Sequence, residues 1–220
     1  MSVSRSQDPN LSQKDRLRIL YPMVHEEETP LPQFWSSFDK HHFITLAEQG
    51  RCALYDDPGI WENGTQYFEP SSVRANYPIP ESCGMYYFEV RIISKGRKGN
   101  IGVGLSTRDV DLFRLPGWVK HSYAYHGDDG NKFGNRAEGQ AYGPTFTTND
   151  VIGCGLNLKD RSCLFTKNGT DLGVAFTDLP SNLYPTVGLF SPGEVVSGNF
   201  GQDIFVFDVE KKMHDLQNLK

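Results

Sequence analysis

From Phe34 onward the chain consists of short apolar runs separated by turn residues, with almost no helical periodicity. The longest run is Met85–Ser94, where Tyr86, Phe88 and Val90 fall on one face. Such alternation with a period of two is typical of a strand. The 22 glycines and 13 prolines are spread between the runs and not gathered in one tract. About ten strands with turns between them, and no alternation of strands with helices, predict an all-β, two-layer antiparallel sandwich.

The expected strands can be read off as ten ranges. They are His42–Ala47, Cys52–Tyr55, Met85–Ser94, Asn100–Ser106, His121–His126, Val151–Leu158, Cys163–Thr166, Gly173–Phe176, Tyr184–Phe190 and Glu194–Phe200. Between two of them, Asn168-Gly169 is a strong hairpin signal.

The two ends of the chain have a different character from its middle. Residues 1–29 are polar and rich in charge and proline, so we expect a mobile tail and extended lead-in, with a short helix at Gln13–Leu20. Residues 208–220 carry apolar side chains at roughly helical spacing and predict a short C-terminal helix. The domain itself is then expected to span residues 30–207.

Composition limits the classes of partner. The 27 acidic and 22 basic side chains give a formal net charge of −5, so we expect neither nucleic acid nor an anionic membrane. No apolar run approaches the ~18 residues of a membrane span, and Met1–Lys14 lacks the apolar core of a signal peptide. The 4 cysteines form no Cys-x-x-Cys pair, which argues against a zinc ribbon. We expect a cytosolic or nuclear chain with no cofactor and no metal.

Tyr125–Gly130 is the string most like an enzyme site, because His126 stands close to Asp128 and Asp129. A histidine beside carboxylates can form a metal site or an acid/base pair. Adjacent aspartates on a strand point to opposite faces, which is poor geometry for chelation, so a strand ending in a tight turn is the simpler interpretation. Cys83 has no histidine near it in sequence, and a buried or turn thiol is more common than a nucleophile. We therefore expect no catalytic activity.

Several short strings, in their order and spacing over residues 30–207, carry a resemblance. They are Ser72–Ala75, Pro78–Pro80, Tyr86–Val90, Gly102–Leu105, Leu115–Trp118, Tyr125–Gly130, Gly143–Thr147, Thr166–Gly169 and Leu183–Gly188. Together they resemble the SPRY domain of the Ran-binding protein M family. The resemblance implies a bent, concanavalin-like sandwich that binds proteins without catalysis. The stretch Asp56–Glu69 is longer than the usual early loop of such domains and lies near the surface where they take peptides, so we expect partner choice to differ from the family's.

Related SPRY modules bind short linear segments of partners through loops at one edge of the sandwich. The resemblance assigns this role to Arg74, Arg114, Leu115, Pro116, Gly117, Trp118, Tyr123, Phe190 and Ser191. Tryptophan and arginine concentrate binding energy in a small patch, and a Pro-Gly pair fixes a loop before binding. Each assignment has a plain alternative, since Trp118, Tyr123 and Phe190 can belong to the core and Arg74 can form an internal ion pair.

Members of this family continue into LisH, CTLH and CRA helical segments that assemble a ubiquitin ligase, and this chain ends at Lys220, before such segments. We expect a monomeric module that binds a protein or peptide partner, as a scaffold or as a substrate or adaptor receptor of such a ligase. Two alternatives stay open. One is a lectin-like, glycan-binding sandwich that uses His126, Asp128 and Asp129, and the other is a secreted SPRY effector of a parasite, which would need a signal peptide.

Overall fold

The computed structural model describes residues 4–218, and almost all of its regular structure is β. The strands are β1 (Trp35–Lys40), β2 (Ile44–Ala47), β3 (Cys52–Tyr55), β4 (Ile60–Glu62), β5 (Thr65–Tyr67), β6 (Ser71–Ala75), β7 (Met85–Lys95), β8 (Gly102–Ser106), β9 (Ser122–His126), β10 (Asn131–Gly134), β11 (Gln140–Ala141), β12 (Val151–Asn157), β13 (Ser162–Lys167), β14 (Thr170–Phe176), β15 (Tyr184–Leu189) and β16 (Glu194–Asn199). The helices are α1 (Gln13–Leu20) and α2 (Val209–Asn218), with 3₁₀ turns η1 (Arg5–Gln7), η2 (Glu48–Gly50) and η3 (Glu81–Cys83).

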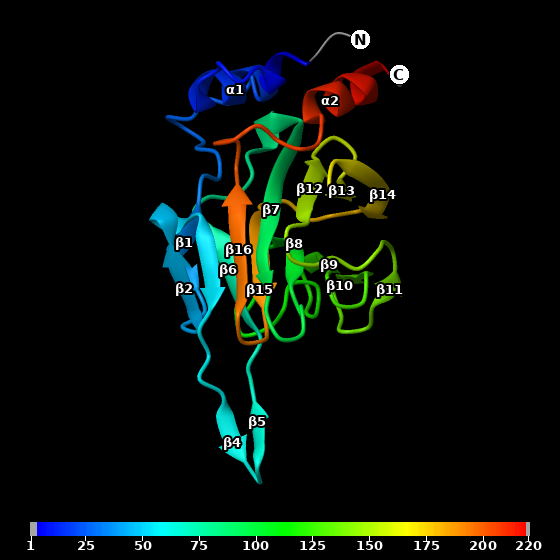
Figure 1. The fold of residues 1–220 in the computed structure, drawn as a ribbon. Coiled ribbons are helices and arrows are strands. Elements are labelled where there is room, and N and C mark those ends of the chain that lie inside the picture. Colours follow the sequence, from blue (N-terminus) through cyan, green and yellow to red (C-terminus); the bar gives the residue numbers. More distant parts are fainter. Residues whose placement is uncertain (1–3, 219–220) are drawn as a thin grey trace.

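Two sheets of 7 strands each form the two layers of the sandwich (Figure 1). The first sheet has the order β1-β6-β15-β8-β9-β10-β11, and the second has the order β14-β13-β12-β7-β16-β3-β2. All strand pairs in both sheets are antiparallel. The expected fold class is therefore confirmed. A separate two-stranded ribbon, β4-β5, projects away from the layers.

Aromatic side chains fill the space between the layers. Trp35 comes from β1 of the first sheet, while Phe88 and Phe200 come from β7 and from the end of β16 in the second, and all are buried. The ring of Trp35 meets Phe200 edge-on at 4.9 Å, and Phe88 stacks on Phe200 at 6.0 Å between ring centroids. Such large rings contribute most of the apolar area that leaves water on folding.

Near the start of β7, the outer face of the second sheet is covered by segments close to the chain ends, which the strand pattern alone did not predict. Tyr87 and Glu89 point away from the core, yet both are buried. The carboxylate of Glu89 accepts the backbone N–H groups of Val206 and Phe207, each at 3.1 Å. A buried carboxylate is stable only when such donors satisfy it, so Glu89 fixes the segment that leads to α2.

The N-terminal segment, which we expected to be mobile, packs onto the same end of the sandwich from residue 4 onward. The expected helix is present with the same bounds as α1, and Ser12 caps it by accepting the N–H of Asp15 at 3.2 Å. Leu17 is buried, and the guanidinium of Arg16 donates to the carbonyls of Gly201 and Gln202. Figure 1 shows α1 and α2 together at this end. The expected C-terminal helix is present as α2, with Leu219 outside the described residues.

Some strands gave no recognisable signal in the sequence. The strand β6 reads Ser-Ser-Val-Arg-Ala and is polar, yet all of its residues are buried. The strand β1, the ribbon strands β4 and β5 and the short strands β10 and β11 were likewise not expected. No helix among residues 4–218 is long and apolar enough to cross a membrane.

Candidate functional site

The long connection between β8 and β9, residues 107–121, lies across the outer face of the first sheet, and we call it the covering loop. The side chains of β6 that point outward hold it in place. The hydroxyl of Ser72 donates to the carbonyl of Arg114 at 2.6 Å, and the N–H of Ser72 donates to the carbonyl of Leu112 at 2.7 Å. The polar sequence of β6 therefore reflects its contacts with this loop.

Arg74 is the strongest of these attachments. Its guanidinium donates to both carboxylate oxygens of Asp39, at 2.7 and 2.9 Å. The remaining nitrogen donates to the carbonyls of Thr107 and Val110, at 3.0 and 2.8 Å. Only 3% of Arg74 is exposed, so its donors are not free for a partner. The assignment of Arg74 as a peptide-binding residue is corrected by this geometry, because the side chain supports the loop from below.

Pro116 sits in a depression made by glycines of two neighbouring strands. A Cβ on Gly188 of β15 would lie 2.5 Å from Cδ of Pro116, and a Cβ on Gly102 of β8 would lie 3.2 Å from the same atom. The first contact is too short for a side chain, and the second is tighter than an ordinary van der Waals contact. Because Leu115, Pro116 and Gly117 are buried in this depression, they set the path of the covering loop and do not themselves face a partner.

His126 also holds the covering loop at Pro116. Its Nε2 lies 2.8 Å from the carbonyl oxygen of Pro116, which can only accept, so Nε2–H is the donor. The ring stacks on Phe133 at 4.2 Å between centroids. Burial lowers the pKa of His126 to about 4, so the imidazole is neutral at pH 7.

The lectin-like or acid/base alternative does not fit this position of His126. The imidazole is 1% exposed and its Nε2–H is used by the carbonyl of Pro116, whereas Asp128 and Asp129 lie in the exposed turn that follows β9. Asp129 accepts the N–H of Asn131 at 2.9 Å, as in a turn closed by an aspartate side chain. Residues 4–218 contain no group of three metal-ligating side chains, and burial raises the pKa of the Cys83 thiol to about 12.

A second buried carboxylate, Glu194, holds the turn between β15 and β16. It accepts the N–H groups of Phe190 and Ser191, at 2.6 and 3.0 Å, and the hydroxyl of Ser191 at 2.5 Å. Burial raises the pKa of Glu194, although these donors oppose the shift. Ser191 is thereby buried and structural, and Phe190 is left at the surface of a fixed turn.

The part of the predicted site that reaches solvent is small. Trp118 and Phe190 are half-buried and meet edge-on, with ring centroids 6.0 Å apart. Arg114 is exposed, and its guanidinium lies 5.1 Å from the ring of Phe113, a residue that the sequence did not single out and that is itself exposed. Of the nine predicted residues, the structure thus presents Arg114, Trp118 and Phe190 at the surface, and we call these three the loop surface.

Tyr123 points the other way. Strand alternation places it on the inner face of β9, where its ring meets Phe176 of the second sheet at 5.4 Å. It is 6% exposed. Its assignment to a peptide site is therefore corrected to a core position.

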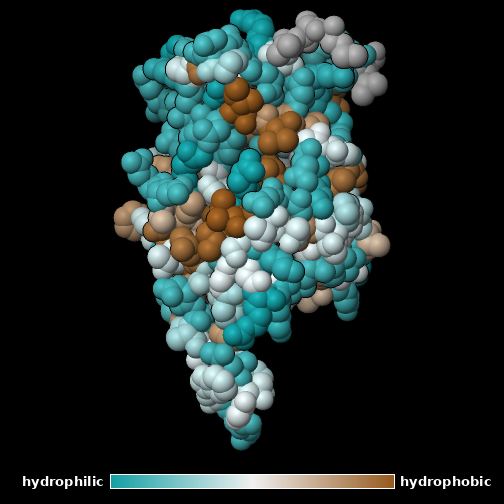
Figure 2. Space-filling view, in the orientation of Figure 1, coloured by the Kyte–Doolittle hydropathy of each residue, from teal (hydrophilic) through white to brown (hydrophobic). Residues whose placement is uncertain are grey.

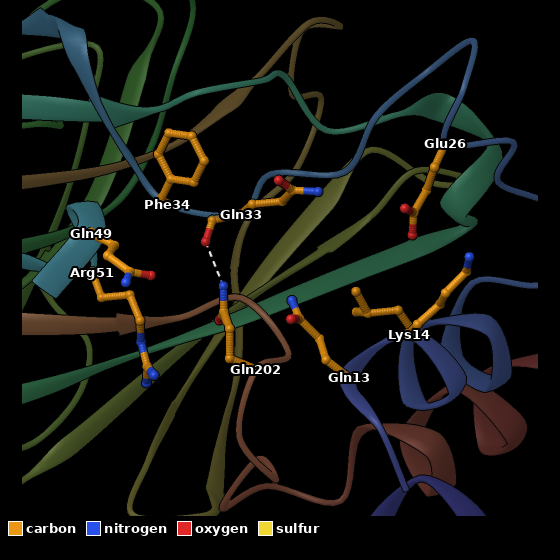
Figure 3. A pocket seen from close by; sticks show the side chains of 9 residues that line it. Gln13, Lys14, Glu26, Gln33, Phe34, Gln49, Arg51 and Gln202 are labelled. Atoms are coloured by element: carbon orange, nitrogen blue, oxygen red, sulfur yellow. Dashed lines mark hydrogen bonds between the residues drawn. The ribbon is translucent and has the colours of Figure 1, made fainter.

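A polar hollow of about 370 Å³ lies elsewhere, between α1 and the edge near β3 (Figure 3). Four glutamines reach it, together with Lys14, Glu26 and Arg51. The amide of Gln202 donates to the carbonyl of Gln33 across it. None of the predicted site residues lines this hollow.

The comparisons with known proteins agree with this architecture. A family model described as "SPRY domain" matches residues 85–203. The chain belongs to the SPRY domain family. A crystal structure of a human SPRY domain is 32% identical, with a TM-score of 0.63, and covers 72% of this chain and 95% of that one. The SPRY domain of human HERC1, at 23% identity and a TM-score of 0.63, shares the fold.

This SPRY domain is similar to Ran-binding proteins. It is 57% identical over 201 residues to Ran-binding protein 10 of Danio rerio, covering 91% of this chain and 32% of that protein. It is 56% identical over 200 residues to Ran-binding protein 9 of Homo sapiens, covering 91% and 27%. The chain thus spans about a third or less of the length of these relatives. SPRY domains are a protein-interaction fold and are generally non-catalytic, so the chain is a protein-interaction module.

Proposed function

We propose that this module binds a short linear segment of a partner protein through the loop surface. The observation that carries the proposal is the way the surface is held. Two half-buried aromatic rings and an exposed arginine stand on turns that buried polar side chains fix from beneath. Tryptophan and arginine are enriched among residues that dominate binding energy, and a surface fixed in advance loses little entropy on binding.

The loop surface also favours acidic or polar segments. Arg114 offers guanidinium donors in a planar fork that suits carboxylates. The turn of residues 95–99 lies against the β15–β16 turn, with the N–H of Lys98 donating to Ser191 at 3.1 Å, and it adds exposed basic side chains nearby. Following the similarity to Ran-binding proteins 9 and 10, we propose that the module is monomeric and acts in the cytosol or nucleus, as a scaffold or receptor of a CTLH-type ubiquitin ligase.

Selection from a random library of 16-residue peptides displayed on phage tests the binding surface. Peptides selected on the wild-type protein are synthesised and titrated by calorimetry against Trp118→Ala, Trp118→Phe and Tyr77→Ala. Tyr77 is an exposed tyrosine outside the loop surface and serves as the matched control. We expect Trp118→Ala to lose at least about 2 kcal/mol of binding energy and Trp118→Phe less, with circular dichroism unchanged. If every selected peptide bound wild type and Trp118→Ala equally, the proposal that the loop surface binds a partner would be wrong.

A further inference from the structure

The segment between β3 and β6, residues 56–69, forms an arm that stands clear of the sandwich (Figures 1 and 2), and we call it the hairpin arm. Its strands β4 and β5 pair only with each other, with Ile60 opposite Tyr67 and Trp61 opposite Gln66. The exposed fractions are 61% for Ile60, 69% for Trp61 and 53% for Tyr67. Large apolar side chains gathered at an exposed tip are typical of interaction sites.

The base of the arm is fixed to the domain. The carboxylate of Asp57, which is buried, accepts the N–H groups of Gly59 and Glu69 at 2.7 and 2.8 Å. The hydroxyl of Tyr55 lies 2.9 Å from the same carboxylate. Because Asp57 ties the outgoing and returning strands together, the arm has a defined direction before it meets a partner.

The tip is also preformed. Asn63 and Gly64 have φ angles of 49° and 74°, the left-handed values that a tight two-residue hairpin requires. Asparagine and glycine are the residues that adopt these angles at least cost. The arm is therefore a regular ribbon and not an irregular loop, although each of its strands has 3 residues.

Both outer edges of this ribbon are open, since no other strand in residues 4–218 pairs with β4 or β5. Unpaired edges are templates for a further strand, and many domains take up extended peptides in this way. A two-stranded ribbon is only marginally stable by itself and gains from a third strand. The arm therefore offers backbone pairing together with apolar side chains.

The negative charge of the arm limits which partner segments can pair with it as a further strand. Residues 56–69 contain four carboxylates and neither lysine nor arginine. Asp57 is used at the base, whereas Asp56, Glu62 and Glu69 are exposed. An acidic segment brought against this ribbon would be repelled, and a segment with lysine or arginine would be attracted.

We propose that the hairpin arm takes up an extended, basic and apolar segment of a partner protein as a third strand of the β4-β5 ribbon. Apolar side chains of that segment cover the Ile60–Tyr67 face or Trp61, and its basic side chains face the carboxylates. The guanidinium of Arg97 lies 5.5 Å from the ring of Phe68 at the base of the arm, so the basic turn of residues 95–99 stands between this site and the loop surface.

A library of random 12-residue peptides displayed on phage tests the proposal. The protein is used as the full chain. Peptides are selected on the wild type, and those that also bind the double variant Trp61→Ala/Tyr67→Ala are removed. Enriched peptides are synthesised and titrated by calorimetry against wild type, Trp61→Ala, Trp118→Ala and Phe38→Ala. Phe38, which is 99% exposed on β1, is the matched control for loss of an exposed aromatic ring. Circular dichroism of each variant shows whether it is folded.

We expect the enriched peptides to carry a net positive charge, with basic and apolar residues alternating along their sequence. Trp61→Ala should weaken their binding at least tenfold, while Phe38→Ala and Trp118→Ala change it less than twofold, and added salt should weaken it. Three results would overturn the proposal: no enrichment that depends on the arm, arm-dependent peptides that are neutral or acidic, or self-association of the wild type in sedimentation that Trp61→Ala abolishes. Peptides that respond to Trp118→Ala but not to Trp61→Ala test the loop surface instead, so the two proposals fail separately.

Discussion

The covering loop and the hairpin arm are both connections between strands, but they are held in different ways. The covering loop lies flat on the first sheet and is attached along its length by Ser72, Arg74 and His126. The hairpin arm leaves the domain and is attached at its base by Asp57. The first exposes a few side chains on a firm support, and the second exposes most of its side chains and both strand edges.

The difference shows two ways of preparing a surface for binding. In the covering loop, buried polar side chains replace the regular backbone pairing that a loop lacks, and each must be satisfied for the fold to be stable. In the hairpin arm, the backbone pairs with itself and the side chains contribute little to the fold. Changes beneath the covering loop should therefore affect stability, whereas changes of the exposed side chains on the arm should affect binding with little effect on stability.

The largest effect on stability is expected from Arg74→Ala. The change removes four donated hydrogen bonds and leaves Asp39 and two carbonyls without their partner. Loss of one member of a largely buried ion pair costs about 3 kcal/mol. Urea unfolding at pH 7 measures the change, with Arg114→Ala as the control that should stay within about 0.5 kcal/mol. A loss below about 1 kcal/mol for Arg74→Ala would mean that the covering loop does not depend on this contact.

A glycine substitution compares the two regions directly. A Cβ at position 188 would meet Pro116 at 2.5 Å and Ser72 at 2.7 Å, so we expect Gly188→Ala to cost about 2 kcal/mol through overpacking. Gly64 in the arm has no atom within 4 Å of the added Cβ, and its cost comes only from its φ of 74°. We expect Gly64→Ala to cost about 1 kcal/mol. Thermal and urea unfolding of both variants measure the difference, and the reverse order would contradict the close seating of Pro116.

Acid should loosen the covering loop through His126. Its pKa in the folded protein, about 4, is below the usual 6.5, so its contribution to stability is present above pH 6.5 and is lost as the pH falls toward 4. The wild type should lose about 1.2 kcal/mol between pH 7 and pH 5.5 relative to His126→Gln. Glu89 and Glu194 have raised pKa values, so acid changes their contribution to stability in the opposite direction. Both proteins carry these carboxyl groups, so their contribution cancels in the difference between wild type and His126→Gln. Parallel pH curves for the two proteins would show that His126 is not held neutral.

The smallest effect is expected at the tip of the arm. Trp61 is 69% exposed, so Trp61→Ala should change the free energy of unfolding by less than about 0.5 kcal/mol. Hydrogen exchange should show the same contrast, with faster exchange at residues 60–67 than at the N–H groups of Gly117 and Phe190, which donate to buried side chains. Slow exchange of the arm in the free protein would mean that it packs against something in solution.

The sequence predicted the sandwich because alternating runs such as Met85–Ser94 report which face of a strand is buried. It did not predict β6, because Ser72 and Arg74 face the covering loop and make a buried strand look polar. Nor did it predict that Tyr87 and Glu89 would be covered. Their cover comes from residues more than a hundred positions later, and periodicity within one strand carries no information about such contacts.

The candidate site stays a prediction, and the structure shows where its residues lie. Two of the loops that the family resemblance named do meet, since Trp118 and Phe190 are in contact although they lie far apart in the chain. The resemblance could not separate the exposed side chains from the supporting ones, because burial of Arg74 depends on Asp39 and on two carbonyls of the covering loop. In the hairpin arm, Asn63-Gly64 is a readable turn signal with Trp61 beside it, but the sequence predicted a long loop there and not a ribbon.

The most direct test of the central claim is a titration of a peptide selected on the wild-type protein against paired tryptophan variants. The account predicts that Trp118→Ala weakens binding of a loop-surface peptide by at least about 2 kcal/mol, while Trp61→Ala and the Tyr77→Ala control leave it unchanged. Binding that survives Trp118→Ala with the fold intact would contradict the claim that the loop surface is where this SPRY domain meets its partner.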